Sequence, residues 1–102
     1  MSTTAEIEAR RTAVAIVRSA VDGDRRARRV LRSSVEDARE LRLALEGLAR
    51  GLAVVNPAVP RAPASFDGLV AYIGRHVQHM ARADGVTTRS ILDRLALAAL
   101  GA

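Results

Sequence analysis

The chain has 102 residues, 49% of them apolar, and a formal net charge of +5 at pH 7. This length and apolar content suffice for one domain with its own core. There is no Cys, and all 16 basic residues are Arg. Disulfides, thiolate metal sites, a thiol nucleophile, a Schiff-base amine and a P-loop lysine are therefore excluded.

Composition also limits the kinds of binding surface and the cellular compartment that we expect for the protein. Phe66 and Tyr72 are the only aromatic residues, too few for a surface that stacks bases. The most apolar stretch, 48–59, includes an arginine, an asparagine and a proline, and is shorter than the roughly 20 apolar residues of a membrane span. The first residues lack the apolar run of a secretory signal. With basic residues restricted to Arg and abundant Ala, Val and Leu, we expect a bacterial, cytoplasmic protein without a membrane segment.

Apolar residues recur at helical spacing along the chain, which predicts an all-α fold of about five helices. The first helix should span 5–21, with Thr3 and Glu6 in capping-box positions. Gly23 should form a tight turn between two aspartates. A short helix over 25–32 follows, with three residues expected to face inward: Ala27, Val30 and Leu31.

That short helix concentrates basic charge in five residues: Arg25, Arg26, Arg28, Arg29 and Arg32. Such a basic patch is typical of surfaces that bind nucleic acid or an acidic protein. The alternative is a solvated face, balanced by the i,i+4 pairs Asp22–Arg26 and Asp24–Arg28. Both interpretations stay open at this point.

The next helix carries the strongest pattern in the chain. Ser34 is its expected N-cap, with Asp37 in the capping-box position, and Asn56-Pro57 should end it. Four leucines of this helix recur at the spacing of a coiled-coil seam, and we expect them to serve packing or self-association: Leu41, Leu45, Leu48 and Leu52.

A second apolar strip lies on the far side of the same helix and consists of Leu43, Gly47, Gly51 and Val54. Each glycine costs about 1 kcal/mol of helix propensity relative to Ala, which favours close approach of another helix as its purpose. We therefore expect this helix to be central, or to be covered on one side by a second subunit.

All three prolines fall in residues 56–65, which we expect to be an extended, solvent-exposed linker. A helix should then begin near Ser65 or Phe66 and end at Gly85. A last helix over 88–100, capped by Thr87, is apolar all round and should leave Leu97 and Leu100 for a partner. The chain thus predicts one helical domain, 1–102, built from a three-helix unit (1–55), the linker and a helical pair (66–102).

Residues 80–95, MARADGVTTRSILDRL, resemble the helix-turn-helix signature of bacterial repressors such as the lac-repressor family. The matching positions are Ala81, Gly85, Val86 and Ile91, together with Thr87 and Ser90. The resemblance implies DNA contacts by Thr87, Thr88 and Arg89, with Arg89 suited to guanine and Thr88 to a phosphate. The signature expects apolar residues where this chain has Asp84 and Arg94. Alternatively, the glycine and the threonine are the caps that any two successive helices need.

His76 and His79 are the only imidazoles, three residues apart on the fourth predicted helix. Two such residues are half of a metal site, but no carboxylate pattern completes it. Tyr72, one turn before His76, favours a stacked pair of the two rings instead. Motifs of nucleotide-binding loops, nucleophile elbows and metalloproteases are lacking. We therefore predict no catalytic, cofactor or metal site.

The sequence thus predicts a small non-enzymatic interaction or regulatory protein. We expect it to form a homo-oligomer, or to bind a protein partner, through apolar helix faces. The alternative is a DNA-binding regulator that uses 80–95, helped by the arginines of 25–32. No small-molecule substrate is inferred.

Overall fold

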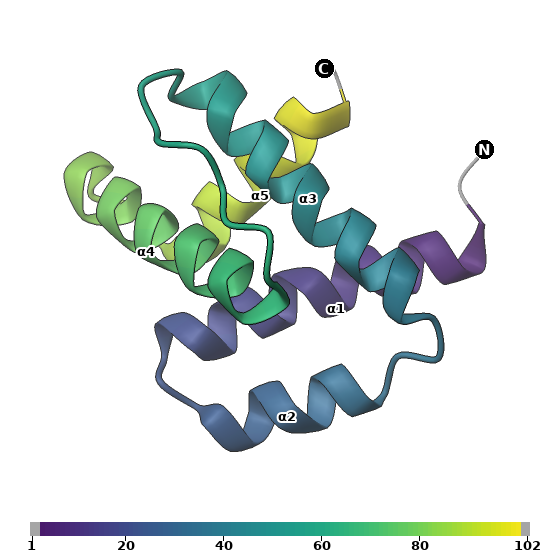
Figure 1. Ribbon diagram of the computed structural model, residues 1–102. Coiled ribbons are helices and arrows are strands. Elements are labelled where there is room, and N and C mark those ends of the chain that lie inside the picture. The colour runs from purple at the N-terminus through teal and green to yellow at the C-terminus, as the bar shows by residue number, and fades with distance from the viewer. Residues whose placement is uncertain (1–2, 101–102) are drawn as a thin grey trace.

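The computed structural model describes residues 3–100, which form five helices and no strand (Figure 1). The helices are α1 (Thr4–Val21), α2 (Arg25–Ser33), α3 (Ala38–Val55), α4 (Phe66–Asp84) and α5 (Thr88–Leu100). The predicted all-α fold of five helices is confirmed. None of these helices is both long and apolar enough to cross a membrane.

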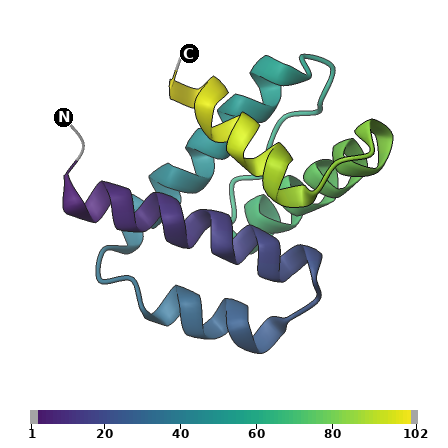
Figure 2. The ribbon, with the colours of Figure 1, turned by 180° about the vertical axis from the view of Figure 1, so that it is seen from behind.

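Helix α1 lies across the middle of the molecule. Figures 1 and 2 show α2 running antiparallel along one side of α1, with α3, α4 and α5 on the other side. The backbone of α2 lies beside α1 alone, whereas α3 contacts α1, α4 and, most extensively, α5. The C-terminal pair is therefore joined to the N-terminal helices by α4 packing on α1 and by α5 packing on α3, and the structure measures 35 × 32 × 24 Å.

Short polar residues begin most helices where the sequence predicts them. The Thr3 hydroxyl accepts the Glu6 N–H at 3.1 Å, and the Ser65 hydroxyl accepts the Gly68 N–H at 3.1 Å. Gly85 ends α4 with a φ of 67°, a conformation that only glycine adopts without strain. These contacts satisfy backbone groups that helix ends leave unpaired.

The start of α3 differs from the prediction. The Asp37 carboxylate, rather than the Ser34 hydroxyl, accepts the first N–H groups of α3, those of Arg39 at 3.0 Å and Glu40 at 3.3 Å. The Ser34 hydroxyl donates to the Leu31 carbonyl at 2.7 Å and so completes the end of α2. A carboxylate is the stronger acceptor at a helix N-terminus because it also interacts with the helix dipole.

One apolar core joins α1, α3, α4 and α5. Its fully buried side chains are Ile16, Val17, Leu41, Leu45, Leu52, Val70, Ile73, Val77, Ile91, Leu92 and Leu95. Gly51 lies against the backbone of Leu95, so close that a Cβ at this position would overlap the Leu95 carbonyl. The predicted close approach at this glycine is thus made by α5 of the same chain.

One expectation about exposure was wrong, and that for the proline segment needs one change, since most of residues 56–65 are exposed as predicted. Val30 is 62% exposed and α2 has no buried residue; Ala27, Arg28 and Leu31 are the residues of α2 that are half-buried. The proline segment is not a free linker. Val59 and Ala62 pack against the core, and the Tyr72 hydroxyl donates to the Pro60 carbonyl at 2.6 Å.

Candidate interaction surfaces

The leucine seam of α3 is not a surface. Leu41, Leu45, Leu48 and Leu52 are each at most 5% exposed and belong to the core that they share with the other helices. Of the two predicted roles, packing or self-association, their burial supports packing within one chain. Leu48, at 5% exposed, also lines the groove described below.

The outer side of α3 carries a strip of four residues at helical spacing: Glu40, Leu43, Gly47 and Arg50. We call it the α3 strip. Leu43 is 45% exposed, and a Cβ at Gly47 would meet only the Arg50 guanidinium, at 3.7 Å. The strip therefore has an acid at one end, a base at the other, and an apolar side chain and an open glycine between them.

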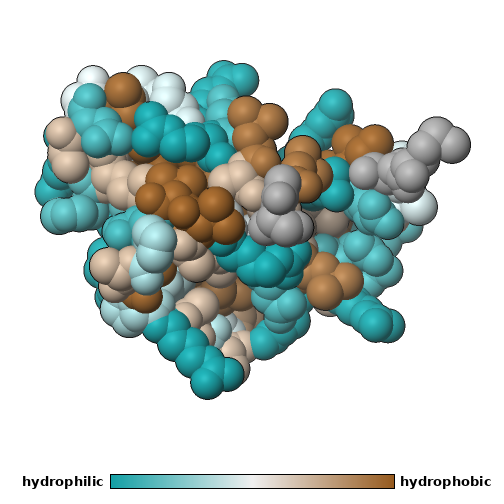
Figure 3. All heavy atoms as spheres, turned by 90° about the horizontal axis from the view of Figure 1, so that it is seen from above, coloured by the Kyte–Doolittle hydropathy of each residue, from teal (hydrophilic) through white to brown (hydrophobic). Residues whose placement is uncertain are grey.

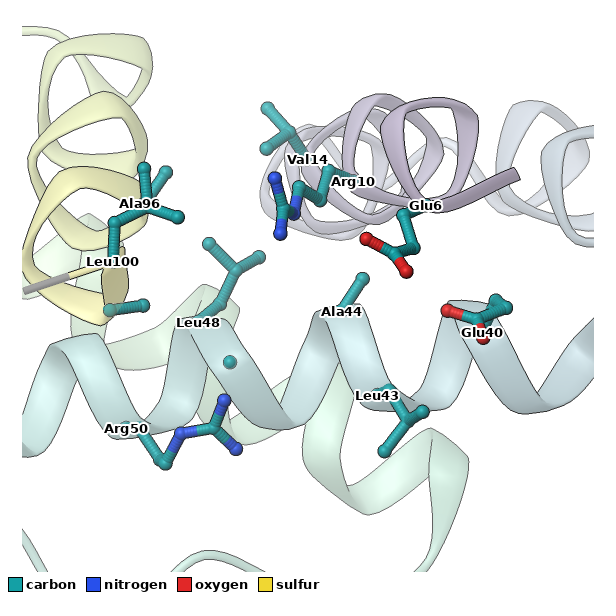
Figure 4. A pocket seen from close by; sticks show the side chains of 12 residues that line it. Glu6, Arg10, Val14, Glu40, Leu43, Ala44, Leu48, Arg50, Ala96 and Leu100 are labelled. Carbon is teal, nitrogen blue, oxygen red and sulfur yellow. The ribbon is translucent and has the colours of Figure 1, made fainter. Parts of the chain in front are cut away.

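The α3 strip borders a groove of about 400 Å³ between α1, α3 and α5. Apolar residues gather on this upper face of the molecule, around the C-terminal end of the chain (Figure 3). Val14, Leu48 and Leu100 line the groove, and Leu100 is 67% exposed. Figure 4 shows Glu40 and Arg50 toward opposite ends of the lining part of α3, with Leu43 between them. Leu97, 70% exposed, adds apolar surface on α5.

Both charged ends of the α3 strip are unpaired within residues 3–100. Neither the Glu40 carboxylate nor the Arg50 guanidinium has a hydrogen-bond or ion-pair partner there, whereas Arg42 and Glu46, also on α3, pair at 3.3 Å. Sequence reasoning did not single out Glu40 and Arg50. The signal in the sequence was that Glu40 and Arg50 lie equally far from position 45, one on each side. This symmetry becomes informative only once Leu43 and Gly47 are known to face outward.

The five arginines of α2 do not behave alike. The Arg32 guanidinium lies 3.4 Å from the Asp67 carboxylate and 4.1 Å from the centre of the Phe66 ring. The expected pairs Asp22–Arg26 and Asp24–Arg28 are absent from the described ion pairs. The Asp24 carboxylate instead accepts the Ala27 N–H at 2.9 Å as the N-cap of α2. Within the described chain, the side chains of Arg25, Arg26, Arg28 and Arg29 have no ionic partner.

The helix-turn-helix-like segment forms the end of α4, a turn and the start of α5. The Thr87 hydroxyl accepts the Ser90 N–H at 3.1 Å, so it caps α5 as predicted. Thr88 is half-buried and Arg89 is exposed. Leu92, on the same helix, is fully buried in the core.

The two departures from the helix-turn-helix signature contact each other. Arg94 on α5 pairs with Asp84 on α4 at 3.0 Å, with each side chain about half exposed. This ion pair ties the two helices together at the surface, where the signature has apolar packing. The segment is thus compatible with an ordinary helix–turn–helix connection.

His76 and His79 are not brought together with further ligands. His76 contacts Tyr72, as expected, with ring centroids 4.7 Å apart; the rings meet edge-on, at an interplanar angle of 64°, rather than as the stacked pair that the spacing predicted. Within residues 3–100, no cluster of three or more His, Cys, Asp or Glu side chains could hold a metal ion. The arrangement around His76 is therefore one of side-chain packing.

Comparisons with protein-family models, with curated protein sequences and with solved structures found no match for this chain. The α3 strip with its groove and the arginines of α2 are therefore interpreted from their own geometry and charge.

Proposed function

We propose that this protein is a non-catalytic helical module that forms a two-fold symmetric dimer through the α3 strip. The observation that carries the proposal is the self-complementarity of the strip. Symmetric dimers use the same patch on both subunits, so each residue must suit the residue that the symmetry places opposite it.

An antiparallel pairing of two α3 helices meets this condition. If the two-fold axis passes the level of residue 45, Glu40 lies opposite the partner's Arg50, and Leu43 lies opposite the partner's Gly47. Glu40 and Arg50 are separated by ten residues, about 15 Å along a helix. Each dimer would then contain two ion pairs at the ends and two leucines inserted over glycines in the centre.

The apolar contacts would supply most of the affinity. Burying the exposed part of one Leu43 side chain contributes about 1 kcal/mol, and symmetry doubles it. The exposed Leu97 and Leu100 lie beside the groove and would add area. Exposed ion pairs contribute about 0–1 kcal/mol each, so Glu40 and Arg50 would fix the antiparallel orientation rather than the strength.

The first test is Leu43→Glu, followed by sedimentation equilibrium across micromolar concentrations. We expect the parent chain to dimerise and the variant to be monomeric, because a carboxylate would be buried opposite Gly47 of the partner subunit. Val30→Glu is the matched control: Val30 is also a large exposed apolar residue on a helix, but it lies on α2. A monomeric parent, or equal weakening by both substitutions, would overturn the proposal.

A charge exchange tests the orientation. Glu40→Arg places two arginines opposite each other and Arg50→Glu places two glutamates opposite each other, so each should weaken the dimer. The double variant E40R/R50E restores opposite charges and should recover association. Circular dichroism checks that α3 remains folded, because an Arg in the first turn of α3 lowers the stability of the helix by about 0.3–1 kcal/mol. If the double variant associates no better than the single ones, the antiparallel pairing is wrong.

A further inference from the structure

Arg25, Arg26 and Arg29 project from the outer side of α2, and we call them the α2 arginine face. All three are exposed, and no carboxylate within residues 3–100 pairs with them. Unlike Arg32, which contacts Phe66 and Asp67, they have no contact that holds the guanidinium groups in place. The charge of this face is therefore available to an external anion.

The position of α2 makes this face protrude. Figures 1 and 2 show α2 at the lower edge of the molecule, with α1 between it and the helices α3 and α5. Since α2 contains no buried residue, it stands out as a convex rod about 10–12 Å wide. A convex rod fits a groove or a curved polymer better than it fits a pocket.

The chemistry of α2 selects among anionic partners. Binding at a membrane surface requires a broad apolar face, and protein interfaces depend on apolar or aromatic anchors. The outer side of α2 has only Val30, at the flank of the arginines. A surface with exposed guanidinium groups and almost no apolar area instead suits a regular array of phosphates, where release of counterions supplies the affinity.

We propose that the α2 arginine face binds the phosphate backbone of a duplex nucleic acid without reading its sequence. The width of α2 matches the roughly 12 Å major groove of B-DNA, in which guanidinium groups on its outer side reach phosphates. Binding to the phosphates of a duplex requires few aromatic residues, whereas binding of single strands depends on aromatic side chains that stack on the bases. The inference does not depend on the proposed dimer, because the α3 strip lies beyond α1 from this face.

The test measures binding of the full chain to random-sequence duplex DNA, and to duplex RNA, by fluorescence anisotropy at several salt concentrations. The parent should bind at low salt with a steep salt dependence. The variant R25Q/R29Q should bind more weakly, and the slope of log K against log salt should fall by about 1.8, since each lost phosphate contact removes about 0.9. R25K/R29K retains the charges and should keep most of the slope.

The matched control is R82Q/R89Q, which removes two exposed arginines near the α4–α5 turn. It should leave affinity and slope close to those of the parent. If R82Q/R89Q causes the larger loss, binding occurs at the helix-turn-helix-like segment and the assignment to α2 is wrong. Absence of binding at low salt, or tighter binding to vesicles of phosphatidylserine and phosphatidylcholine than to either duplex, would also overturn it. Circular dichroism confirms that the variants remain folded.

Discussion

At the scale of single residues, the environment of His76 changes its protonation. Its Nε2 atom is buried and has no hydrogen-bond partner among residues 3–100. Loss of hydration lowers the pKa of His76 below its ordinary value of 6.5, and the positive charges of Arg75 and His79 lower it further. The Tyr72 ring packs edge-on against the imidazole, which fits a neutral side chain.

This pKa shift predicts a loss of stability in mild acid. Because the pKa of His76 is lower in the folded chain than in the unfolded chain, the unfolded chain takes up a proton first as pH falls. The contribution of neutral His76 is complete above about pH 6.5 and decreases as pH falls from there toward the folded-state pKa. Urea unfolding at about pH 7.5 and about pH 5.5 should show a smaller acid loss for His76→Gln than for the parent.

His79→Gln serves as the control for this measurement, because His79 is exposed and lies on the same helix. It should retain most of the acid loss of the parent. An unchanged acid loss in His76→Gln would show that another group causes it.

At the scale of elements, the two glycines of α3 have different roles. The sequence marks both equally as costs to helix propensity. In the structure, Gly51 lies against the backbone of Leu95, whereas a Cβ at Gly47 would make only an ordinary contact with the Arg50 guanidinium, at 3.7 Å. Only the packing of α5 onto α3 distinguishes them, because that contact joins residues far apart in the chain.

The difference predicts opposite effects of the same substitution. Gly47→Ala should stabilise the chain by up to about 1 kcal/mol through helix propensity. Gly51→Ala should destabilise it by about 1–3 kcal/mol, because α5 must move away from α3. Chemical unfolding, at a concentration where the chain is monomeric, measures both. Similar effects from the two substitutions would contradict the helix packing described above.

The helix boundaries show how far local sequence patterns suffice. Thr3, Asp24, Ser65 and Thr87 each cap the helix that follows, because capping depends on residues only two or three positions apart. The error at Ser34 arose because the interval before α3 contains both a serine and an aspartate, and either type caps a helix. Asp37 does so here, while Ser34 completes α2.

At the scale of the whole molecule, stability should be uneven. Helices α1, α3, α4 and α5 share one core, but α2 has no buried side chain and its backbone lies beside α1 alone. Its additional link to α4 is the exposed Arg32–Asp67 ion pair with the Arg32–Phe66 contact. A segment with so little buried area opens at low free-energy cost without unfolding the rest.

Native-state hydrogen exchange tests this expectation. The amides of α2 should exchange faster than those of the central turns of α3 and α4, whose exchange should approach the global unfolding limit. Equal protection across all the helices would mean that α2 is held by contacts beyond those described. Binding of duplex DNA at the α2 arginine face should slow exchange in α2 selectively.

The sequence by itself determined the all-α class, most helix ends and the absence of thiol and lysine chemistry, because these depend on composition and on neighbours within one or two turns. It also identified the two sides of α3, but it could not say which side is covered. Only the tertiary structure decided that the core encloses Leu41, Leu45, Leu48 and Leu52. It also decided that, on the opposite side of α3, α5 covers Gly51 while Leu43 and Val54 remain exposed. The physical reason is that an apolar strip on a helix indicates burial but does not indicate which element covers it. That element is determined by contacts between residues distant in the chain.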